Sequence, residues 1–185
     1  KEKSYASKKK SYTRYFDSSI HDRGEIANQR GRLGDYEGDT VYGSVGKGYL
    51  ITGVDRQSRL TVAAIARDKT IESTNAAFIA AFRKAKLVPP ITLTLDNGTE
   101  FLGFKDLEQA LGTKVYFADA HAPWQRGSNE NINGLIRFFF PRGTDFTKVT
   151  DEQLDAVLEL INNRPRKCLG YLSPNEFINK VLHLA

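Results

Sequence analysis

The sequence predicts an α/β domain in which helices flank a mixed five-stranded sheet. Three strand-like segments follow one another closely in the first half of the chain, and two further strands alternate with helices after them. Strands joined by short turns pair antiparallel, whereas strands joined through a helix usually pair in parallel, so this order favours a mixed sheet. With 185 residues, of which 40% are hydrophobic, the chain is long enough for one domain with a substantial core.

The first three strands are expected at residues 36–42, 49–54 and 60–66, which are rich in β-branched and aromatic side chains. The polar stretch 55–59 separates the second and third segments and predicts an antiparallel hairpin. A helix then begins at Thr70, because the apolar residues that follow it keep mostly helical spacing.

The alternating half begins with a strand at residues 91–96, where apolar and polar side chains alternate strictly. The Asn97-Gly98 pair that follows usually marks a hairpin, but residues 104–111 keep helical spacing, so we expect a strand, a turn and a helix. A short strand at residues 115–118 completes the predicted sheet.

Three helices are expected in the carboxyl-terminal third. The first stops at Pro141, and its apolar residues recur at helical spacing to give one buried stripe, formed by Ile132, Leu135, Ile136 and Phe139. Capping boxes at 150–153 and 173–176 begin the other two helices.

Charge divides the chain near residue 32. Residues 1–32 hold nine Lys or Arg against four Asp or Glu, which accounts for the whole net charge of +5, whereas residues 33–185 hold 18 of each sign. We therefore expect a basic arm or linker over residues 1–32 and one domain over residues 33–185, with nucleic acid as a partner. Because the chain starts at Lys1 and contains no methionine, we expect it to be a piece of a longer protein.

Composition excludes several classes of site. A single cysteine allows no disulfide within the chain and fits a reducing, cytoplasmic compartment. One cysteine and three scattered histidines do not suffice for a zinc cluster, so any metal would be held by oxygen, which points to Mg²⁺ or Mn²⁺. No apolar run approaches 18 residues, so we expect no transmembrane helix and no membrane partner.

Three carboxylates stand where distant segments of such a sheet can meet. Asp39 lies in the middle of the first predicted strand, Asp96 at the end of the fourth, and Glu130 on the helix after the fifth. The first strand and the first strand after a crossover helix are often neighbours, and a helix packed across them can bring Glu130 close. Clustered carboxylates repel one another unless divalent cations neutralise them, and two such ions can drive a displacement at phosphorus.

Each of these acids also has a simpler interpretation. Asp39 would be a charge on an edge strand, Asp96 is a common residue before an Asn-Gly turn, and Glu130 can pair with arginines on its own helix face. Glu37 shares the strand face of Asp39 and is a rival ligand that spacing does not exclude.

Four segments carry these acids and a closing basic run: GDYEGDTV at 34–41, LDNGTEF at 95–101, WQRGSNENINGLIR at 124–137 and NNRPRKCLGYLSP at 162–174. In this order, and with 33 residues between Asp96 and Glu130, they resemble bacterial DDE transposases of the insertion-sequence-thirty (IS-thirty) family. The resemblance covers about residues 31–180. Tyr36 stands where that family usually has tryptophan; an aromatic ring is kept, which indicates a change in packing.

The resemblance implies a ribonuclease-H-like, retroviral-integrase-like catalytic domain in which Asp39, Asp96 and Glu130 bind two Mg²⁺ or Mn²⁺ ions. It implies nicking of the element's DNA ends and transfer of the freed 3′-hydroxyl to target DNA. The family also carries a helix-turn-helix domain before this core, which is absent here, so end-specific binding by this chain alone is not expected. We also expect a homodimer or higher oligomer on DNA, associated with the bacterial nucleoid.

Several basic and aromatic residues are candidate DNA contacts. Arg126 and Arg137 flank Glu130 on its helix face and would hold backbone phosphates. Trp124 or Tyr116 would stack on an unpaired base, although a lone tryptophan before a helix is more often a core anchor. Three cations follow a helix end and either contact DNA or cap carbonyl groups: Arg164, Arg166 and Lys167.

Two other functions stay open on the sequence. One is a related nuclease that hydrolyses nucleic acid without strand transfer. The other is a DNA-binding or assembly module whose acids are structural; the presence of all three acids argues against it.

Overall fold

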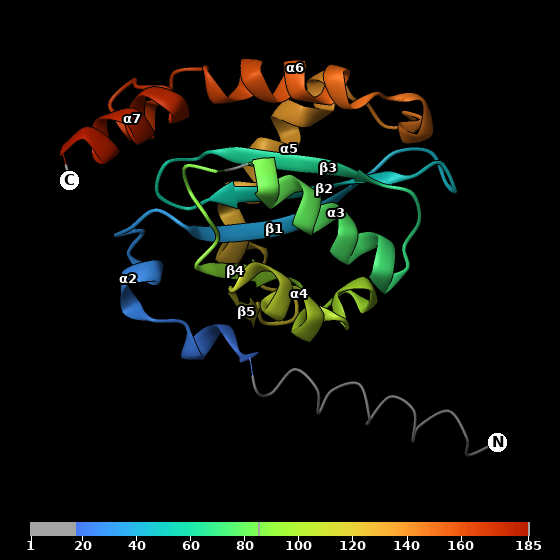
Figure 1. Cartoon of the computed structure of the whole chain (residues 1–185), viewed down its shortest axis with the longest axis horizontal. Coiled ribbons are helices and arrows are strands. Elements are labelled where there is room, and N and C mark those ends of the chain that lie inside the picture. Colours follow the sequence, from blue (N-terminus) through green and yellow to red (C-terminus); the bar gives the residue numbers. More distant parts are fainter. Residues whose placement is uncertain (1–17, 85, 185) are drawn as a thin grey trace.

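The sheet is mixed and five-stranded, as the sequence predicts, with the strand order β3-β2-β1-β4-β5. The computed structural model describes residues 18–84 and 86–184 (Figure 1). The central strand β1 (Asp35–Tyr42) pairs antiparallel with β2 (Tyr49–Asp55) and parallel with β4 (Thr92–Leu95). The edges are β3 (Thr61–Ala66), antiparallel to β2, and β5 (Lys114–Phe117), parallel to β4.

Helices cover both faces of this sheet. In Figure 1, α3 (Ile71–Lys84) and α4 (Phe104–Leu111) lie on the near face, and α5 (Gly127–Phe139) passes behind the sheet. α6 (Asp151–Asn162) follows on the side of α5, and α7 (Pro174–Leu184) ends the chain. Each face has its own apolar core. The near core includes Phe78, Phe82, Leu93 and Leu95, and the far core includes Leu50, Ile132, Ile136 and Leu154.

Alternation along β1 divides its side chains between the two layers. Tyr36 belongs to the core under α3, whereas Val41 belongs to the core under α5, and Glu37 and Asp39 share the face of Val41. Gly38 falls between them and faces the α3 layer. A Cβ atom at this position would lie 2.5 Å from Cδ2 of Leu95. The glycine therefore lets β4 side chains pack tightly beneath the strand that carries the acids.

The predicted arm is wrong for residues 18–32, which pack on the sheet. Ser19 bridges Phe117 of the edge strand β5, and the 3-10 helix η2 (Ile20–Asp22) and the short helix α2 (Glu25–Asn28) follow. Ile20 and Ala27 are buried. So few apolar contacts leave no periodic pattern in the sequence, which is why the segment looks like a linker. Residues 1–17, with the Lys8-Lys9-Lys10 run, lie outside the described residues.

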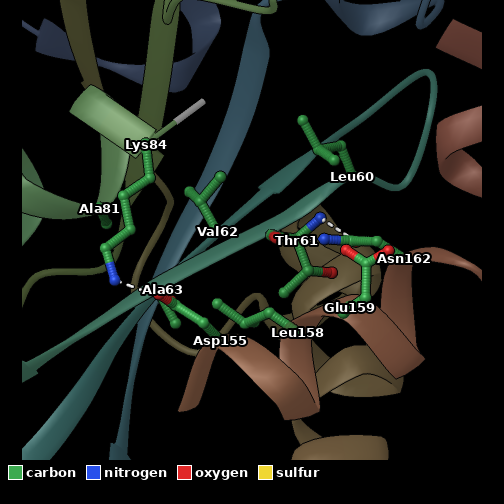
Figure 2. Close-up of a pocket in the computed structure, with 10 residues that line it drawn as sticks. All are labelled: Leu60, Thr61, Val62, Ala63, Ala81, Lys84, Asp155, Leu158, Glu159 and Asn162. Atoms are coloured by element: carbon green, nitrogen blue, oxygen red, sulfur yellow. Dashed lines mark hydrogen bonds and ion pairs between the residues drawn. The ribbon is translucent and has the colours of Figure 1, made fainter. Parts of the chain in front are cut away.

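The edge strand β3 is closed by side chains from α6 (Figure 2). The Asn162 amide accepts from the Thr61 backbone N–H at 2.8 Å and donates to its carbonyl at 2.8 Å, as a neighbouring strand would. Lys84 of α3 pairs with Asp155 of α6 at 2.7 Å across the same cavity of about 420 Å³. These polar groups satisfy one another, and the Asn162 side chain covers the edge of β3. The cavity is therefore not a candidate site.

The carboxyl-terminal helices begin and pack largely as predicted. Both capping boxes form: Thr150 with Gln153, and Ser173 with Glu176. In α5 the buried stripe is narrower than expected, because Phe139 is 37% exposed. In residues 18–84 and 86–184, no helix is both long enough and apolar enough to cross a membrane.

Candidate active site

The structure brings Asp39 and Asp96 together, as their placement on β1 and at the end of β4 predicts. The two strands are parallel neighbours, and the Arg126 guanidinium lies between the two carboxylates. Its Nη1 atom is 3.4 Å from Oδ1 of Asp39, and its Nη2 atom is 3.3 Å from Oδ2 of Asp96. Nη1 also donates to the Gly38 carbonyl at 3.3 Å. A single positive group therefore offsets two carboxylates that come from segments 57 residues apart.

Asp39 is the more buried of the two acids. Its side chain is 23% exposed, against 40% for Asp96. Oδ1 accepts the Thr40 backbone N–H at 2.8 Å, and Oδ2 accepts the Asn133 side-chain amide at 2.7 Å. Burial raises the pKa of Asp39 above its ordinary value; the Arg126 charge opposes this, and the nearby Asp96 adds to the rise. The ionised form of Asp39 therefore depends on positive charge close by.

Arg126 is not placed as the free phosphate clamp that the sequence suggests. It is held by the two aspartates, at distances near the long end of the hydrogen-bonding range. Its Nε atom is buried and has no partner among the described residues. The side chain thus neutralises the acids without being fully satisfied, which makes it a displaceable counter-charge.

Glu130 shares the helix face of this cluster but does not join it. It follows Arg126 by four residues and precedes Asn133 by three, and both of those side chains contact Asp39. Residues at these spacings lie on one side of a helix. The Glu130 side chain is exposed and makes no hydrogen bond or ion pair with the other described residues. Across the described ranges, no three acidic, imidazole or thiol side chains form a metal-binding group.

The donor set suits a hard divalent cation nonetheless. Asp39 and Asp96 supply oxygen ligands of the kind that Mg²⁺ and Mn²⁺ prefer, and their convergence already requires one positive group between them. Glu130 adds a free carboxylate on the adjacent turn of α5. On the same open side of the helix, a Cβ atom at Gly134 would meet nothing within 4 Å.

Glu37, the rival ligand, is used in a different way. It is fully buried, and both of its oxygens are occupied by protein donors. Oε1 accepts from Arg56 at 2.5 Å and from the Ser128 hydroxyl at 3.2 Å, while Oε2 accepts the backbone N–H groups of Ser128 at 2.8 Å and Asn129 at 3.2 Å. Glu37 is therefore a long-range cap of α5, the helix that carries Glu130.

The segment before β1 supports this cap. Arg56 is buried, and its Nε atom donates to the Ala27 carbonyl at 3.0 Å. Nearby, Arg23 donates to the Thr94 hydroxyl at 2.9 Å, and burial, followed by the repulsion of Arg56, lowers the Arg23 pKa to about 10. Sequence patterns missed these roles of Glu37, Arg56 and Arg23, because each partner lies far away in the chain and the pairing leaves no periodicity.

The candidate DNA contacts differ in their exposure to solvent. Trp124 is 76% exposed, so its interpretation as a core anchor is wrong, and Tyr116 is half-buried on β5. A cavity of about 390 Å³ opens beside Asp96 and Arg126, walled by the loop 118–122. Arg137 is half-buried, with its Nη1 atom unpartnered in the part of the chain described.

The closing cations after α6 lie apart from the carboxylates. Arg166 donates to the Ile161 carbonyl at 2.9 Å, so it caps the end of α6 as one of the two interpretations expects. Arg164 and Lys167 are exposed. None of the three is among the residues that line the cavity beside Asp96.

Residues 30–123 match the family model described as "Integrase core domain", which is about half of the chain. The chain belongs to the integrase core family. The matched stretch contains Asp39 and Asp96 and ends before α5, so Glu130 lies outside it.

Several curated proteins similar to this chain are transposases. It is 41% identical over 165 residues to the "Transposase for insertion sequence element IS4351" of Bacteroides fragilis, covering 89% of this chain and 50% of that protein. It is 40% identical over 161 residues to "Transposase InsI for insertion sequence element IS30A" of Escherichia coli K12, covering 87% of this chain and 42% of that protein. The chain therefore spans about half the length of these relatives.

Solved structures support the fold. One is a simian T-cell lymphotropic virus intasome, with a TM-score of 0.61 and 20% identity over 77% of this chain and 53% of that chain. Another is the HTLV-2 integrase catalytic core domain in complex with magnesium, with a TM-score of 0.56 and 19% identity over 77% of this chain and 94% of that chain. The sheet and its helices are thus those of an integrase core, as the ribonuclease-H-like prediction expects.

Proposed function

We propose that this chain is the catalytic domain of a transposase, which nicks DNA at the ends of an insertion sequence and joins the freed 3′-hydroxyl to target DNA. The observation that carries the proposal is the meeting of Asp39 and Asp96, from parallel neighbouring strands, around one positive group. The similarity to insertion-sequence transposases supports the same activity.

Asp39, Asp96 and Glu130 would together hold Mg²⁺ or Mn²⁺. When bound between such carboxylates, two ions activate the attacking oxygen and stabilise the leaving oxygen of an in-line displacement. Asp39 is kept in place for this role by Thr40 and Asn133, which bind it independently of Arg126. Glu130 would join by turning its free carboxylate along the face of α5 that already contacts Asp39.

DNA is the proposed partner of this site. Arg126 would leave the two aspartates for a backbone phosphate once another cation replaces its charge, and Arg137 would bind a phosphate about three helical turns further along the chain. The exposed ring of Trp124, just before α5, would stack on an unpaired base at the cleaved end. A homodimer or higher oligomer would hold two such ends.

A branched DNA tests the reaction without requiring recognition of a particular end. In this DNA a free 3′-hydroxyl lies beside a phosphodiester that joins the branch. Its attack forms one P–O bond and breaks the P–O bond to the branch, and the proton lost by the attacking hydroxyl is balanced by the proton that the leaving oxygen takes up. We expect the full chain with Mn²⁺ to produce the resealed strand and the released branch. Cleavage by water alone, with no resealed strand, would instead support the nuclease.

The matched variants are Asp96→Asn and Asp106→Asn, which remove the same charge from the site and from an exposed position on α4. We expect Asp96→Asn to abolish strand joining by at least a hundredfold and Asp106→Asn to leave it unchanged. Full activity of Asp96→Asn would refute the proposed site. Thermal melting of each variant checks that the fold is intact.

A further inference from the structure

A second cavity lies next to α5, outside the carboxylate site. Its volume is about 580 Å³, and it is walled by the amino-terminal half of α5 and by three loops. One loop follows α2, one joins β2 to β3, and one joins α6 to α7. Together these loops bring five cations to the cavity: Arg30, Arg59, Arg164, Arg166 and Lys167.

These five cations have no acidic counterpart. No Asp or Glu lines the cavity, and in the described part of the chain none of the five takes part in an ion pair. Their side-chain hydrogen-bond acceptors among the described residues are neutral. Arg59 donates to the Ser128 hydroxyl at 2.6 Å, Arg166 to the Ile161 carbonyl at 2.9 Å, and Arg30 to the Arg56 carbonyl at 3.4 Å. Four of the five lie within residues 33–185, where Lys and Arg equal Asp and Glu in number, so their clustering results from segregation of charge by the fold.

The cluster is also electrostatically unfavourable by itself. The pKa of Arg166 is lowered by burial and next by the charge of Arg164, with Arg59 acting in the same direction. The Arg166 Nε atom is buried and has no partner among the residues described. Four guanidinium groups and an ammonium group converge on one space that lacks a counter-charge, and the planar fork of arginine matches phosphate oxygens.

We infer that this cavity binds a backbone phosphate of DNA, at a second contact point separate from the carboxylates. The inference rests on the proposed function, since it takes DNA as the ligand. The cavity exceeds the size of one phosphate group, and Leu135 and Pro165 give it apolar walls suited to the sugar beside that phosphate.

α5 forms the wall between the two sites. Asn131 lines the cavity, whereas Glu130, the residue before it, does not. An α-helix with its side chains is about 10–12 Å across. The two sites are therefore separated by about one helix diameter. Ser128 links the cavity to the cap of α5, because its hydroxyl accepts from Arg59 and donates to Glu37. A phosphate held in the cavity thus fixes the DNA relative to Glu130 without contacting the reacting phosphorus.

The test compares two double variants with the same loss of charge. Arg164→Gln/Lys167→Gln removes two exposed cations of the cavity, and Lys148→Gln/Lys180→Gln removes two exposed cations elsewhere. The full chain is titrated onto a 30-base-pair duplex in EDTA, and the dissociation constant is followed against salt by fluorescence anisotropy. EDTA removes divalent ions, so the carboxylate site does not contribute to metal-dependent binding.

Because the cavity variant removes cations that neutralise the one bound phosphate, the slope of log affinity against log salt should fall by about 0.9, and affinity at 0.1 M salt should fall by about eightfold. The control variant should change neither by more than about twofold. Equal effects of both variants would overturn the inference and leave only a general charge effect. If tripolyphosphate binds the unaltered chain but not the cavity variant, while both bind the duplex equally, the cavity is a site for small anions and the inference is overturned.

This result is independent of the proposed activity. If the cavity variant binds as the control does while Asp96→Asn loses strand joining, the cavity inference fails and the transposase proposal stands. If the cavity variant loses affinity while the unaltered chain joins no DNA, the transposase proposal fails and the cavity stands as a DNA-phosphate site. Equal melting temperatures of the two double variants exclude unfolding as the cause.

Discussion

Substitution of Glu37 by glutamine tests whether this buried acid holds α5 or binds a metal. The change keeps the size of the side chain, removes its charge and replaces one accepting oxygen with a donating amide. It leaves Arg56, whose side chain is 7% exposed, without its counter-charge. The new amide N–H₂ group would also face a donor, either the Arg56 guanidinium or the Ser128 backbone N–H. Breaking a buried ion pair by removing one partner costs about 3–5 kcal/mol.

We therefore expect Glu37→Gln to lower the free energy of unfolding by about 3–5 kcal/mol in metal-free buffer, measured by urea titration with far-ultraviolet circular dichroism. For a chain of this length the melting temperature should fall by roughly 10 °C. The control is Glu72→Gln, an exposed acid in the first turn of α3, which should change stability by less than about 0.5 kcal/mol.

A second variant separates the ion pair from the helix cap. Glu37→Leu combined with Arg56→Met removes both charges, and we expect it to recover part of the lost stability. The remainder is the cost of leaving the Ser128 and Asn129 N–H groups without an acceptor, about 1–3 kcal/mol each. A Glu37→Gln protein with unchanged stability but no strand joining would refute this reasoning, since Glu37 would then be a ligand and not a cap.

Three further predictions concern charge at the site and in the arm. Arg126→Gln should tighten Mn²⁺ binding by about tenfold, because the Arg126 and Asp39 charges, 3.4 Å apart, attract each other by about 1 kcal/mol in a water-like dielectric. Calorimetric titration measures this change, and weaker binding would contradict the role of Arg126 as a counter-charge. Burial raises the pKa of Asp39, so the protonated carboxyl stabilises the metal-free fold, and this stability is lost as pH rises through the raised pKa. A cation, in contrast, binds only the ionised carboxylate. The increase in melting temperature that Mn²⁺ produces should therefore grow as pH rises through the raised pKa of Asp39 and vanish at lower pH, and a pH-independent increase would exclude Asp39 as a ligand. Replacing the three lysines at residues 8–10 with glutamine should reduce the salt slope of DNA binding by up to about 2.7. This substitution is preferred to deletion of residues 1–32, which would also remove the packed segment 18–32. An unchanged slope would exclude the lysine run from DNA binding.

The sequence by itself determined the elements of the fold and the position of two acids within it. Strand alternation and helical spacing are local properties, so each predicted strand and helix is found within a few residues of its expected place. The crossover from β1 to β4 through α3 follows from chain order, and it places Asp39 beside Asp96. The motifs alone also indicated the integrase core family, because their order and spacing are one-dimensional facts.

Only the tertiary structure decided which charges meet. Glu37 and Arg56 are 19 residues apart and Glu37 and Ser128 are 91 apart, and no periodic pattern records such pairs. The same holds for Arg126, which lies between two aspartates instead of facing solvent, and for residues 18–32, whose few buried side chains anchor them to β5. Local sequence fixes backbone geometry, whereas the partner of a long charged side chain depends on what the folded chain brings within its reach.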